Sequence, residues 1–338
     1  MTDPIPVVPP AAPAAPPPPR PFLGLDAERR HILYAVLGAI LVFAVGAAVR
    51  PGFASPASIS AVLLVASFVG LVAAGQTFVI LIGGIDLSIP SVLNAAAILL
   101  VTSTLGDDSR AVYGITLTLA MGAGLGLLNG VGIAILGVPA VIMTLAMNGI
   151  VEGLMLGLSG GLTCQACASY APPVVQAAVH GSLLGVPLAI YIWVGIIVIV
   201  SIVLSFTTFG RRTYAIGNNA VASHLAGINV PLTTILLYAL SGLFAALAGI
   251  LLVGFGGQAS LEMGTPYLFE SIAAAVVGGV SILGGRGHYL GAAAGAVSLV
   301  ALATVLQTMN MPEYGRDILY GVVVIALLLA YGREQEGA

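Results

Sequence analysis

The sequence predicts an all-α, polytopic membrane protein with about ten transmembrane helices, some of them broken or re-entrant. Of its 338 residues, 59% are apolar, 44 are glycine and only 7% are charged, whereas soluble domains carry roughly 25% charged residues. The mean hydropathy is +1.11. Apolar runs close to the roughly 20 residues that cross a bilayer recur along the chain. Together these features indicate a chain that is dissolved in a membrane.

Composition also excludes two other classes of protein. The ten basic residues are all arginine and are outnumbered by 13 acidic ones, so no basic patch exists to neutralise the phosphates of a nucleic acid. Two cysteines are too few for a secreted disulfide scaffold.

Residues 1–30 are predicted to form a disordered, Pro/Ala-rich cytoplasmic tail. Ten of the 20 prolines lie within residues 1–21, and such a segment buries too little surface to offset its ordering entropy. A docking motif for a partner is the alternative interpretation. The tail lacks the apolar stretch of a signal peptide.

The membrane domain is expected over residues 31–331, followed by a short cytoplasmic tail at 332–338. Charges and Pro/Gly clusters separate its apolar segments. The expected spans are 31–49, 58–82, 88–105, 111–136, 140–159, 188–206, 231–254, 267–284, 288–309 and 316–331. Residues 256–285 also suit two half-spans.

Arginine positions predict that both termini are cytoplasmic, because short cytoplasmic loops are enriched in basic residues. This orientation places Asp107 and Asp108 outside and the polar stretch 209–230 inside. Its cytoplasmic arginines are Arg20, Arg29, Arg30, Arg211, Arg212, Arg286 and Arg333, and its outer ones are Arg50, Arg110 and Arg316.

Two predicted helices carry glycines four residues apart, which lets helix backbones approach closely in a membrane. We expect these glycines to pack against other helices: Gly122, Gly126 and Gly130 on one helix, and Gly149, Gly153 and Gly157 on the other.

Two similar motifs, 82–88 and 277–287, each end one apolar run and precede another. Glycine pairs beside a charge are typical of the broken helices that transporters place along a substrate pathway. Asp86 is expected either to cap the helix that follows it or to pair with Arg286.

No enzyme motif is present. The sequence has no Walker P-loop, no His-Glu-x-x-His and no Gly-x-Ser-x-Gly. Glu152 is the one plainly interior acid, which argues against a proton relay and favours an external source of energy. Cys164 and Cys167 lack enough nearby ligands for a metal site, so a local disulfide and two free thiols remain open.

The polar stretch 209–230 is the expected docking point for a soluble partner. It predicts a short helix around residues 219–225 that ends at Gly227, whose left-handed conformation would close the helix. Such a helix can occupy a groove in a soluble protein. An ordinary cytoplasmic loop is the alternative.

This stretch resembles the cytoplasmic loop of ribose-type ABC sugar permeases, within the superfamily of branched-chain amino acid and sugar permeases. Residues 75–88, which contain Gly-Gly-Ile-Asp-Leu-Ser, resemble the first signature of that family, and residues 272–287 resemble its second. The three motifs occur in the family's order, and the similarity runs from about residue 30 to residue 331.

The resemblance implies the multi-pass permease subunit of an importer in the bacterial inner membrane, working by alternating access. A second copy, a cytoplasmic ABC ATPase that uses ATP and Mg, and a periplasmic sugar-binding protein would be its partners. Lipid would surround the chain, which would bind no cofactor, metal or nucleic acid. The cargo would be a monosaccharide or polyol. A permease for branched-chain amino acids or nucleosides and a gradient-driven carrier are the alternatives.

The resemblance also implies roles for particular residues. The ATPase-coupling loop would use Arg211, Arg212, Gly217, Asn219, Ala222, His224 and Gly227. The signature or gating residues would be Gly83, Gly84, Asp86, Ser88, Glu270, Gly284, Gly285 and Arg286. The chain departs from the family at Asn218 and His224, where glycine and arginine are usual, at Pro90, and at Glu270, which retains one acid of a pair.

Polar side chains within the spans are candidates to face a pathway, because sugar hydroxyls require donors and acceptors. Hydrogen bonds between helices explain the same residues equally well. These residues are Gln76, Asn94, Asn129, Asn148 and Glu152.

Overall fold

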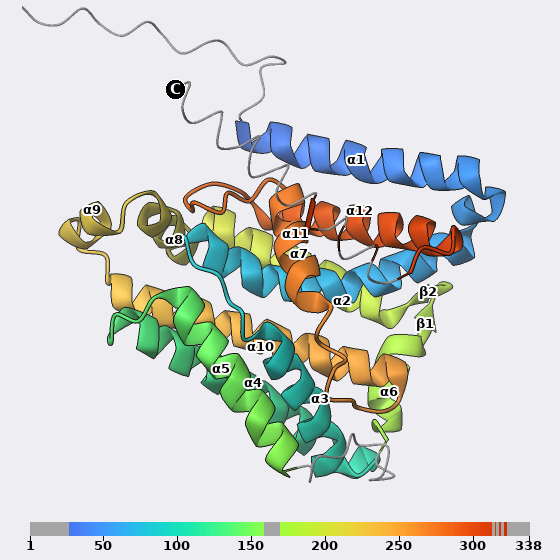
Figure 1. Cartoon of the computed structure of the whole chain (residues 1–338), viewed down its shortest axis with the longest axis horizontal. Coiled ribbons are helices and arrows are strands. Elements are labelled where there is room, and N and C mark those ends of the chain that lie inside the picture. Colours follow the sequence, from blue (N-terminus) through green and yellow to red (C-terminus); the bar gives the residue numbers. More distant parts are fainter. Residues whose placement is uncertain (1–26, 159–169, 313–314, 316–317, 319–320, 323–338) are drawn as a thin grey trace, which may run out of the picture.

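The computed structural model describes residues 27–158, 170–312, 315, 318, 321 and 322, and within them the chain is a bundle of helices with one tiny hairpin (Figure 1). The first helices are α1 (Ala27–Val49), α2 (Pro56–Leu81), α3 (Ile89–Thr104), α4 (Ala111–Ala134), α5 (Ala140–Leu158) and α6 (Pro173–His180). The hairpin strands are β1 (Ser182–Leu183) and β2 (Val186–Pro187), paired antiparallel. The remaining helices are α7 (Leu188–Phe206), α8 (Thr208–Asn218), α9 (Ala220–Leu225), α10 (Val230–Gly256), α11 (Tyr267–Val277) and α12 (Tyr289–Thr308).

Seven of the described helices are long and apolar enough to cross a bilayer, and two shorter apolar helices, α3 and α11, accompany them. The prediction of an all-α, multi-pass membrane protein is therefore confirmed. Nine of the ten expected spans correspond to these helices. The tenth, 316–331, falls almost entirely outside the described residues, as do most of the N-terminal tail and both cysteines.

Helix starts follow local capping chemistry. Ser55 accepts a hydrogen bond from the Ser58 amide at the start of α2, where Pro56 occupies the first helical position. At α10 the Asn229 side chain accepts from the Leu232 amide at 3.0 Å. These caps satisfy amides that would otherwise lack partners at a helix end.

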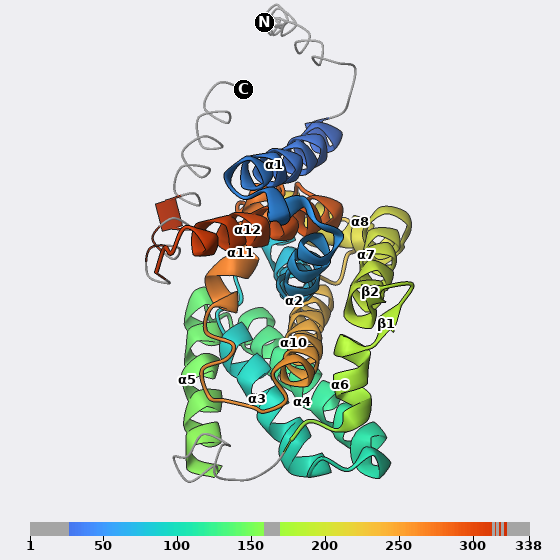
Figure 2. The same cartoon turned by 90° about the vertical axis from the view of Figure 1, so that its right-hand side faces the viewer.

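Helix α10 occupies the centre of the bundle and contacts α2, α3 and α4 (Figure 2). The first glycine stripe makes the contact with α4 close. A Cβ on Gly130 would lie 2.5 Å from the Cα of Ile235, and one on Gly122 would lie 2.5 Å from the carbonyl oxygen of Gly242. The expected close packing of this stripe is confirmed.

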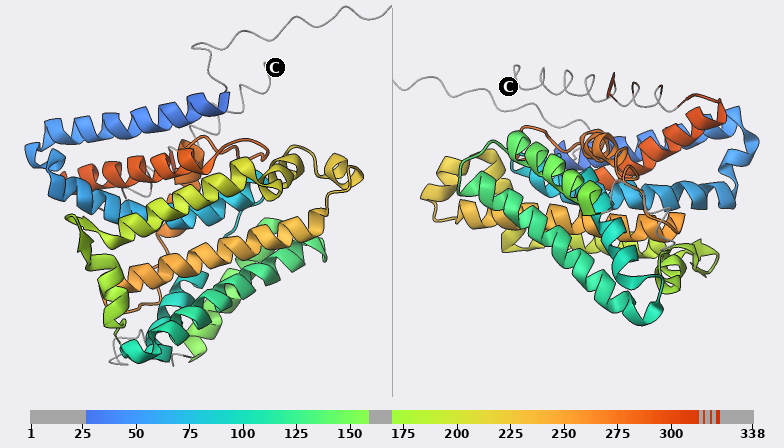
Figure 3. Two further views of the ribbon diagram at one scale, coloured as in Figure 1. Left: turned by 180° about the vertical axis from the view of Figure 1, so that it is seen from behind. Right: turned by 60° about the horizontal axis from the view of Figure 1, so that its bottom comes forward.

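The connections between helices collect at two opposite ends of the bundle (Figure 3). At one end, the amide of Ala171 donates to the carbonyl of Gly257, and the amide of Val174 donates to the Asp108 carboxylate at 2.8 Å. Helices α8 and α9 lie at the other end. The loops that the arginine distribution assigns to opposite sides of the membrane are thus far apart.

Local structure differs from the expectation in two stretches. The span expected at 267–284 is a helix of only 11 residues, which ends at Val277, because Gly279 takes a positive φ of 85° and the chain turns there. Residues 256–285 accordingly form neither one full span nor two half-spans. The stretch 209–230 contains a second helix, α8, in addition to the expected short one.

Candidate functional site

The three family-like motifs meet at one place, where the end of α8 lies against the end of α2 and against the segment 284–287, here called the glycine turn. The amide of Gly285 donates a hydrogen bond to the carbonyl oxygen of Leu81, the last residue of α2, at 2.9 Å. Gly284 and Gly285 have φ values of 86° and 71°, in the left-handed region that glycine adopts without strain. The two motifs that look alike in sequence are therefore in direct contact.

Gly217 on α8 allows this helix to approach both the end of α2 and the glycine turn closely. A Cβ at this position would overlap the carbonyl oxygen of Leu81 and lie 2.5 Å from the amide nitrogen of Gly285. Both of these atoms belong to the backbone, which cannot rotate away as a side chain can. Only glycine fits at this point of α8.

Two side chains of α8 tie the helix to the glycine turn. The Tyr214 hydroxyl donates to the carbonyl of Gly287 at 2.7 Å, and the Asn218 amide group donates to the carbonyl of Gly285 at 3.2 Å. Neither residue is among those implied by the resemblance. Asn218 is a departure from the family pattern, and α8 itself was not expected, so its face toward the glycine turn could not be identified.

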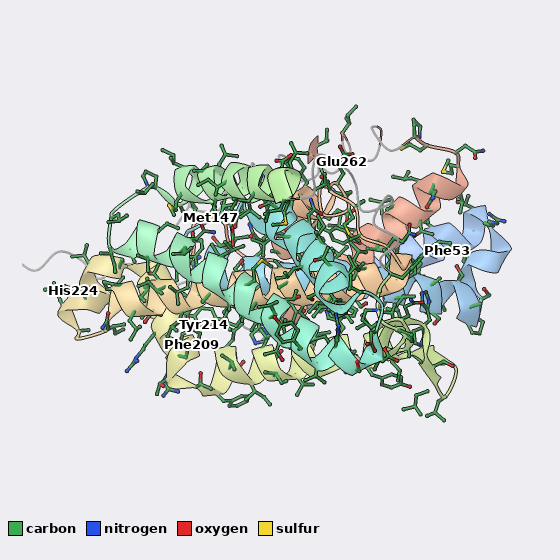
Figure 4. The ribbon with its side chains drawn as sticks, turned by 90° about the horizontal axis from the view of Figure 1, so that it is seen from below. Phe53, Met147, Phe209, Tyr214, His224 and Glu262 are labelled. Atoms are coloured by element: carbon green, nitrogen blue, oxygen red, sulfur yellow. The ribbon has the colours of Figure 1, made fainter. Side chains whose placement is uncertain are left out.

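Helix α9 stands at the tip of this end of the molecule, where Figure 4 shows His224 far from the bundle. The Asn219 side chain caps it by accepting from the Ala222 amide at 2.9 Å. Gly227, with φ 84°, closes it, and the next amide, of Ile228, donates back to the carbonyl of Ser223. The expected short helix is confirmed, with its first residue at Ala220.

The surface around α9 combines apolar and basic groups. Val221 is 72% exposed and Leu225 is 82% exposed. Arg211, Arg212 and His224 are also exposed, and residues 206–261 contain no acid. This surface suits an apolar groove with an acidic rim.

The segment 82–88, here called the linker, follows the end of α2 that contacts α8. It joins α2 to α3 and carries the buried acid Asp86. Its carboxylate accepts from the hydroxyl and amide of Ser88 at 2.6 and 2.9 Å and from the Ser241 hydroxyl at 2.7 Å. Asp86 thus orders the residue before α3 and binds to α10. The alternative of an ion pair with Arg286 is wrong, since Arg286 is exposed and Asp86 is buried with these partners.

Two more hydrogen bonds hold the linker to neighbouring helices. The Asn129 amide group on α4 donates to the Ser88 hydroxyl at 2.8 Å. The amide of Leu87 donates to the hydroxyl of Thr144 on α5 at 3.0 Å. The linker therefore contacts α4, α5 and α10 through polar groups in the interior of the bundle. Ser241 and Thr144 carry no signal in the sequence, because serine and threonine are common in membrane helices.

Among the polar residues of the spans, three are buried within the chain. Asn94 accepts from the Gly264 amide at 2.6 Å and donates to the carbonyl of Leu261, so it binds the loop before α11. Asn129 bonds to the linker, and Gln76 is buried on α2, where neither atom of its amide group has a hydrogen-bond partner among the described residues. For Asn94 and Asn129, hydrogen bonding within the protein is the alternative that the structure supports. Glu270 lies in the first turn of α11, away from the glycine turn.

The other two polar residues lie on α5, where the glycine stripe meets no other residue of the described part of the chain. Glu152 is exposed and Asn148 is half-buried. A Cβ on Gly149, Gly153 or Gly157 would meet no atom within 4 Å. Among the described residues, therefore, the expected packing of this second glycine stripe is not found.

Comparison with known proteins identifies the family. Residues 58–328 match the family described as "Branched-chain amino acid transport system / permease component". The chain belongs to this family. The permease is 32% identical over 302 residues to the ribose import permease protein RbsC of Escherichia coli K12, covering 89% of this chain and 94% of the relative.

Two further relatives are similar over most of their length. The ribose import permease protein RbsC of Haemophilus influenzae is 32% identical to the permease, over 86% of this chain and 90% of its own. The autoinducer 2 import system permease protein LsrC of Escherichia coli O9:H4 is 31% identical, over 88% and 86%. No solved structure matches. The permease is a multi-pass protein of the bacterial inner membrane.

Proposed function

We propose that this permease is the membrane-spanning subunit of an ATP-driven importer that moves a monosaccharide, ribose-like or a related polyol, into the cytoplasm by alternating access. The observation that carries the proposal is its similarity, over more than four-fifths of its length, to permeases named for the import of ribose and autoinducer 2. Permeases for branched-chain amino acids or nucleosides are the less favoured alternative. The permease subunit itself carries out no chemical step.

The ATPase would bind at α9 on the cytoplasmic side. The support for this assignment is the capped, protruding helix with Val221 and Leu225 exposed and arginines beside it. Charge pairs around such a contact would set orientation and association rate. ATP and Mg would be bound by the ATPase, and a periplasmic binding protein would deliver the sugar at the opposite end.

The translocation pathway would lie between two copies of the chain, along the open face of α5. An ionised carboxylate is costly against lipid, so Glu152 favours a face that is covered by protein or water. The unpartnered glycines beside it would let a second helix approach closely. On this arrangement Glu152 and Asn148 would offer hydrogen bonds to sugar hydroxyls.

Co-purification tests the ATPase assignment. The tagged permease, extracted in mild detergent from its native host, should bring a P-loop ATPase with it, and Leu225→Asp should abolish this association while leaving membrane insertion intact. Leu184→Asp is the matched control, because Leu184 is also highly exposed, at 93%, on the opposite end of the molecule. Preparations of the unaltered permease without an ATPase would favour a gradient-driven carrier instead.

Cross-linking tests the two-copy pathway. Gly153→Cys, in a background with Cys164→Ser and Cys167→Ser, should form a dimer with a short bifunctional maleimide. Gly124→Cys on α4, which also has open space beside it, should not. Equal cross-linking at both positions would contradict the proposed face.

A further inference from the structure

The linker touches both the α8 contact and the helix proposed to line the pathway. At its α2 end, Gly83 lies against the glycine turn, since a Cβ on Gly284 would be 2.9 Å from the Gly83 amide nitrogen. At its α3 end, the Leu87 amide bonds to Thr144 on α5. Both contacts lie within five residues, 83–87.

Each end of the linker is held rather than free. Gly83 and Gly84 close α2 with hydrogen bonds to the carbonyls of Ile80 and Val79, at 2.8 and 3.0 Å. Asp86 then binds Ser88 and Ser241, so the middle of the linker is fixed against α10. A short segment held by hydrogen bonds at both ends and at Asp86 passes on a displacement instead of absorbing it.

Thr144 is well placed to receive that displacement. It is fully buried on α5, accepts from the Leu87 amide, and directs its own proton to the Ala140 carbonyl at 2.9 Å. Glu152 lies eight residues further along the same helix, and Gly149, Gly153 and Gly157 of α5 meet no other described residue. A shift of the linker would therefore move the proposed pathway helix directly.

We infer that Tyr214 and Thr144 are positioning residues at the two ends of one mechanical connection, in which α8 displaces the glycine turn, the turn displaces the linker, and the linker displaces α5. This inference rests on the proposed function, because it names the contacts through which the ATPase would act on the pathway. A network counts as a coupling route only if changes at both ends alter the same equilibrium.

The test uses the whole importer, purified with its co-purifying ATPase and reconstituted in liposomes. The readout is the rate at which a water-soluble maleimide labels Glu152→Cys on α5, in the background with Cys164→Ser and Cys167→Ser. Labelling is compared without nucleotide and with ATP plus vanadate. For the otherwise unaltered chain we expect the two rates to differ by about fivefold or more, the size of ordinary coupling between sites.

Two substitutions remove single hydrogen-bonding groups with little change of shape. Tyr214→Phe removes the bond to Gly287, and Thr144→Val removes the acceptor of the Leu87 amide. Each should reduce the nucleotide-dependent difference to less than about twofold, and the double variant should lose no more than the stronger single variant, because the two contacts act in series. Thr144→Ser, which restores the hydroxyl, should restore the difference.

Matched controls separate this effect from loss of stability. Thr116→Val and Tyr113→Phe are the same chemical changes at exposed positions of α4, where Thr116 bonds only within its own helix. Both should label as the unaltered chain does. Independent, additive effects of Tyr214→Phe and Thr144→Val, or full response in both variants, would overturn the inference. Absence of any nucleotide effect in the unaltered complex would overturn the proposed ATP-driven function, and the inference with it.

Discussion

The carboxylate of Asp86 accepts a 2.7 Å hydrogen bond from the hydroxyl of Ser241, which lies 155 residues further along the chain. The bond joins the linker to the central helix α10, and both residues are buried. Their contact explains why an acid is tolerated in the interior of an apolar bundle, since a buried charge requires several hydrogen bonds to replace water.

Loss of the Ser241 hydroxyl should destabilise the fold. Ser241→Ala leaves one carboxylate oxygen of Asp86 without its donor, and we expect the free energy of unfolding to fall by ~1–3 kcal/mol. Thermal unfolding in detergent measures the change. Ser67→Ala is the control, because Ser67 is equally buried but bonds only to a carbonyl of its own helix. Equal losses in both variants would show that Asp86 does not depend on Ser241.

Enlarging Gly217 should stop transport. Gly217→Val forces α8 away from Leu81 and Gly285, and overpacking of this kind costs ~1–3 kcal/mol, while each ~1.4 kcal/mol lost from a working state is a tenfold change in rate. We expect uptake of radiolabelled ribose to fall by about tenfold or more, with normal membrane insertion. Gly124→Val, on a helix surface without neighbours, should leave uptake near that of the unaltered chain. Uptake retained with Gly217→Val would remove the assigned role of α8.

Gly227 should respond differently from Gly217, although the family resemblance groups them together. Gly227 has open space around it but a φ of 84°. Gly227→Ala should therefore cost ~1–2 kcal/mol of local backbone strain. It should weaken α9 and leave the contact between α8 and the glycine turn intact. The measurement is ATPase binding, which should decline, with thermal stability of the isolated permease nearly unchanged. A large loss of stability in the isolated permease would place Gly227 in the packed interior instead.

Asn94 should control the loop before α11. Asn94→Ala removes two hydrogen bonds to that loop, at a cost of ~1–3 kcal/mol, so the loop should open more often. Thr265→Cys, an exposed position of the loop, reports this motion through its labelling rate with a membrane-impermeant maleimide. We expect faster labelling with Asn94→Ala and no change with Thr102→Ala, whose hydroxyl bonds within α3. An unchanged rate with Asn94→Ala would show that other contacts hold the loop.

The single tryptophan should report packing between α7, α2 and α12. Trp193 is 3% exposed, and its indole NH donates to the Tyr289 hydroxyl at 3.0 Å, so its emission should be blue-shifted and poorly quenched by iodide. The ring lies directly over Gly70, where a Cβ would overlap it. Gly70→Ala should shift the emission to longer wavelength, while Gly38→Ala, with no neighbours, should not. Easy quenching in the unaltered chain would contradict this packing.

The helical architecture could be predicted from sequence because long apolar runs have few alternatives in a bilayer. Glycine pairs correctly marked the points where helices end, at Gly83 and near Gly279. The length of α11 could not be predicted, since residues 278–284 are apolar enough to continue a span and only the positive φ values break it. Helix α8 was missed for the opposite reason, because its polar face reads as a loop.

The candidate site was predictable only in part. Gly217 and the glycine pairs were identified through the family resemblance, and the structure brings them together. Of the two roles expected for Asp86, the ion pair with Arg286 was wrong, because opposite charges are the visible signal in a sequence while the hydroxyls of Ser88 and Ser241 are not. Three-dimensional contacts such as Leu87 to Thr144 involve a backbone amide and leave no trace in residue identity.

The interlocked glycines of α4 and α10 constrain how this protein can change shape. Backbone meets backbone at successive levels, from Gly122 against Gly242 to Gly130 against Ile235. The side chain that also meets Gly122 is that of Ala246, a methyl group without rotamers. Packed surfaces of this kind rearrange as whole bodies rather than deform gradually. The two helices should therefore keep their mutual arrangement through the transport cycle and move, where they move, as one rigid body.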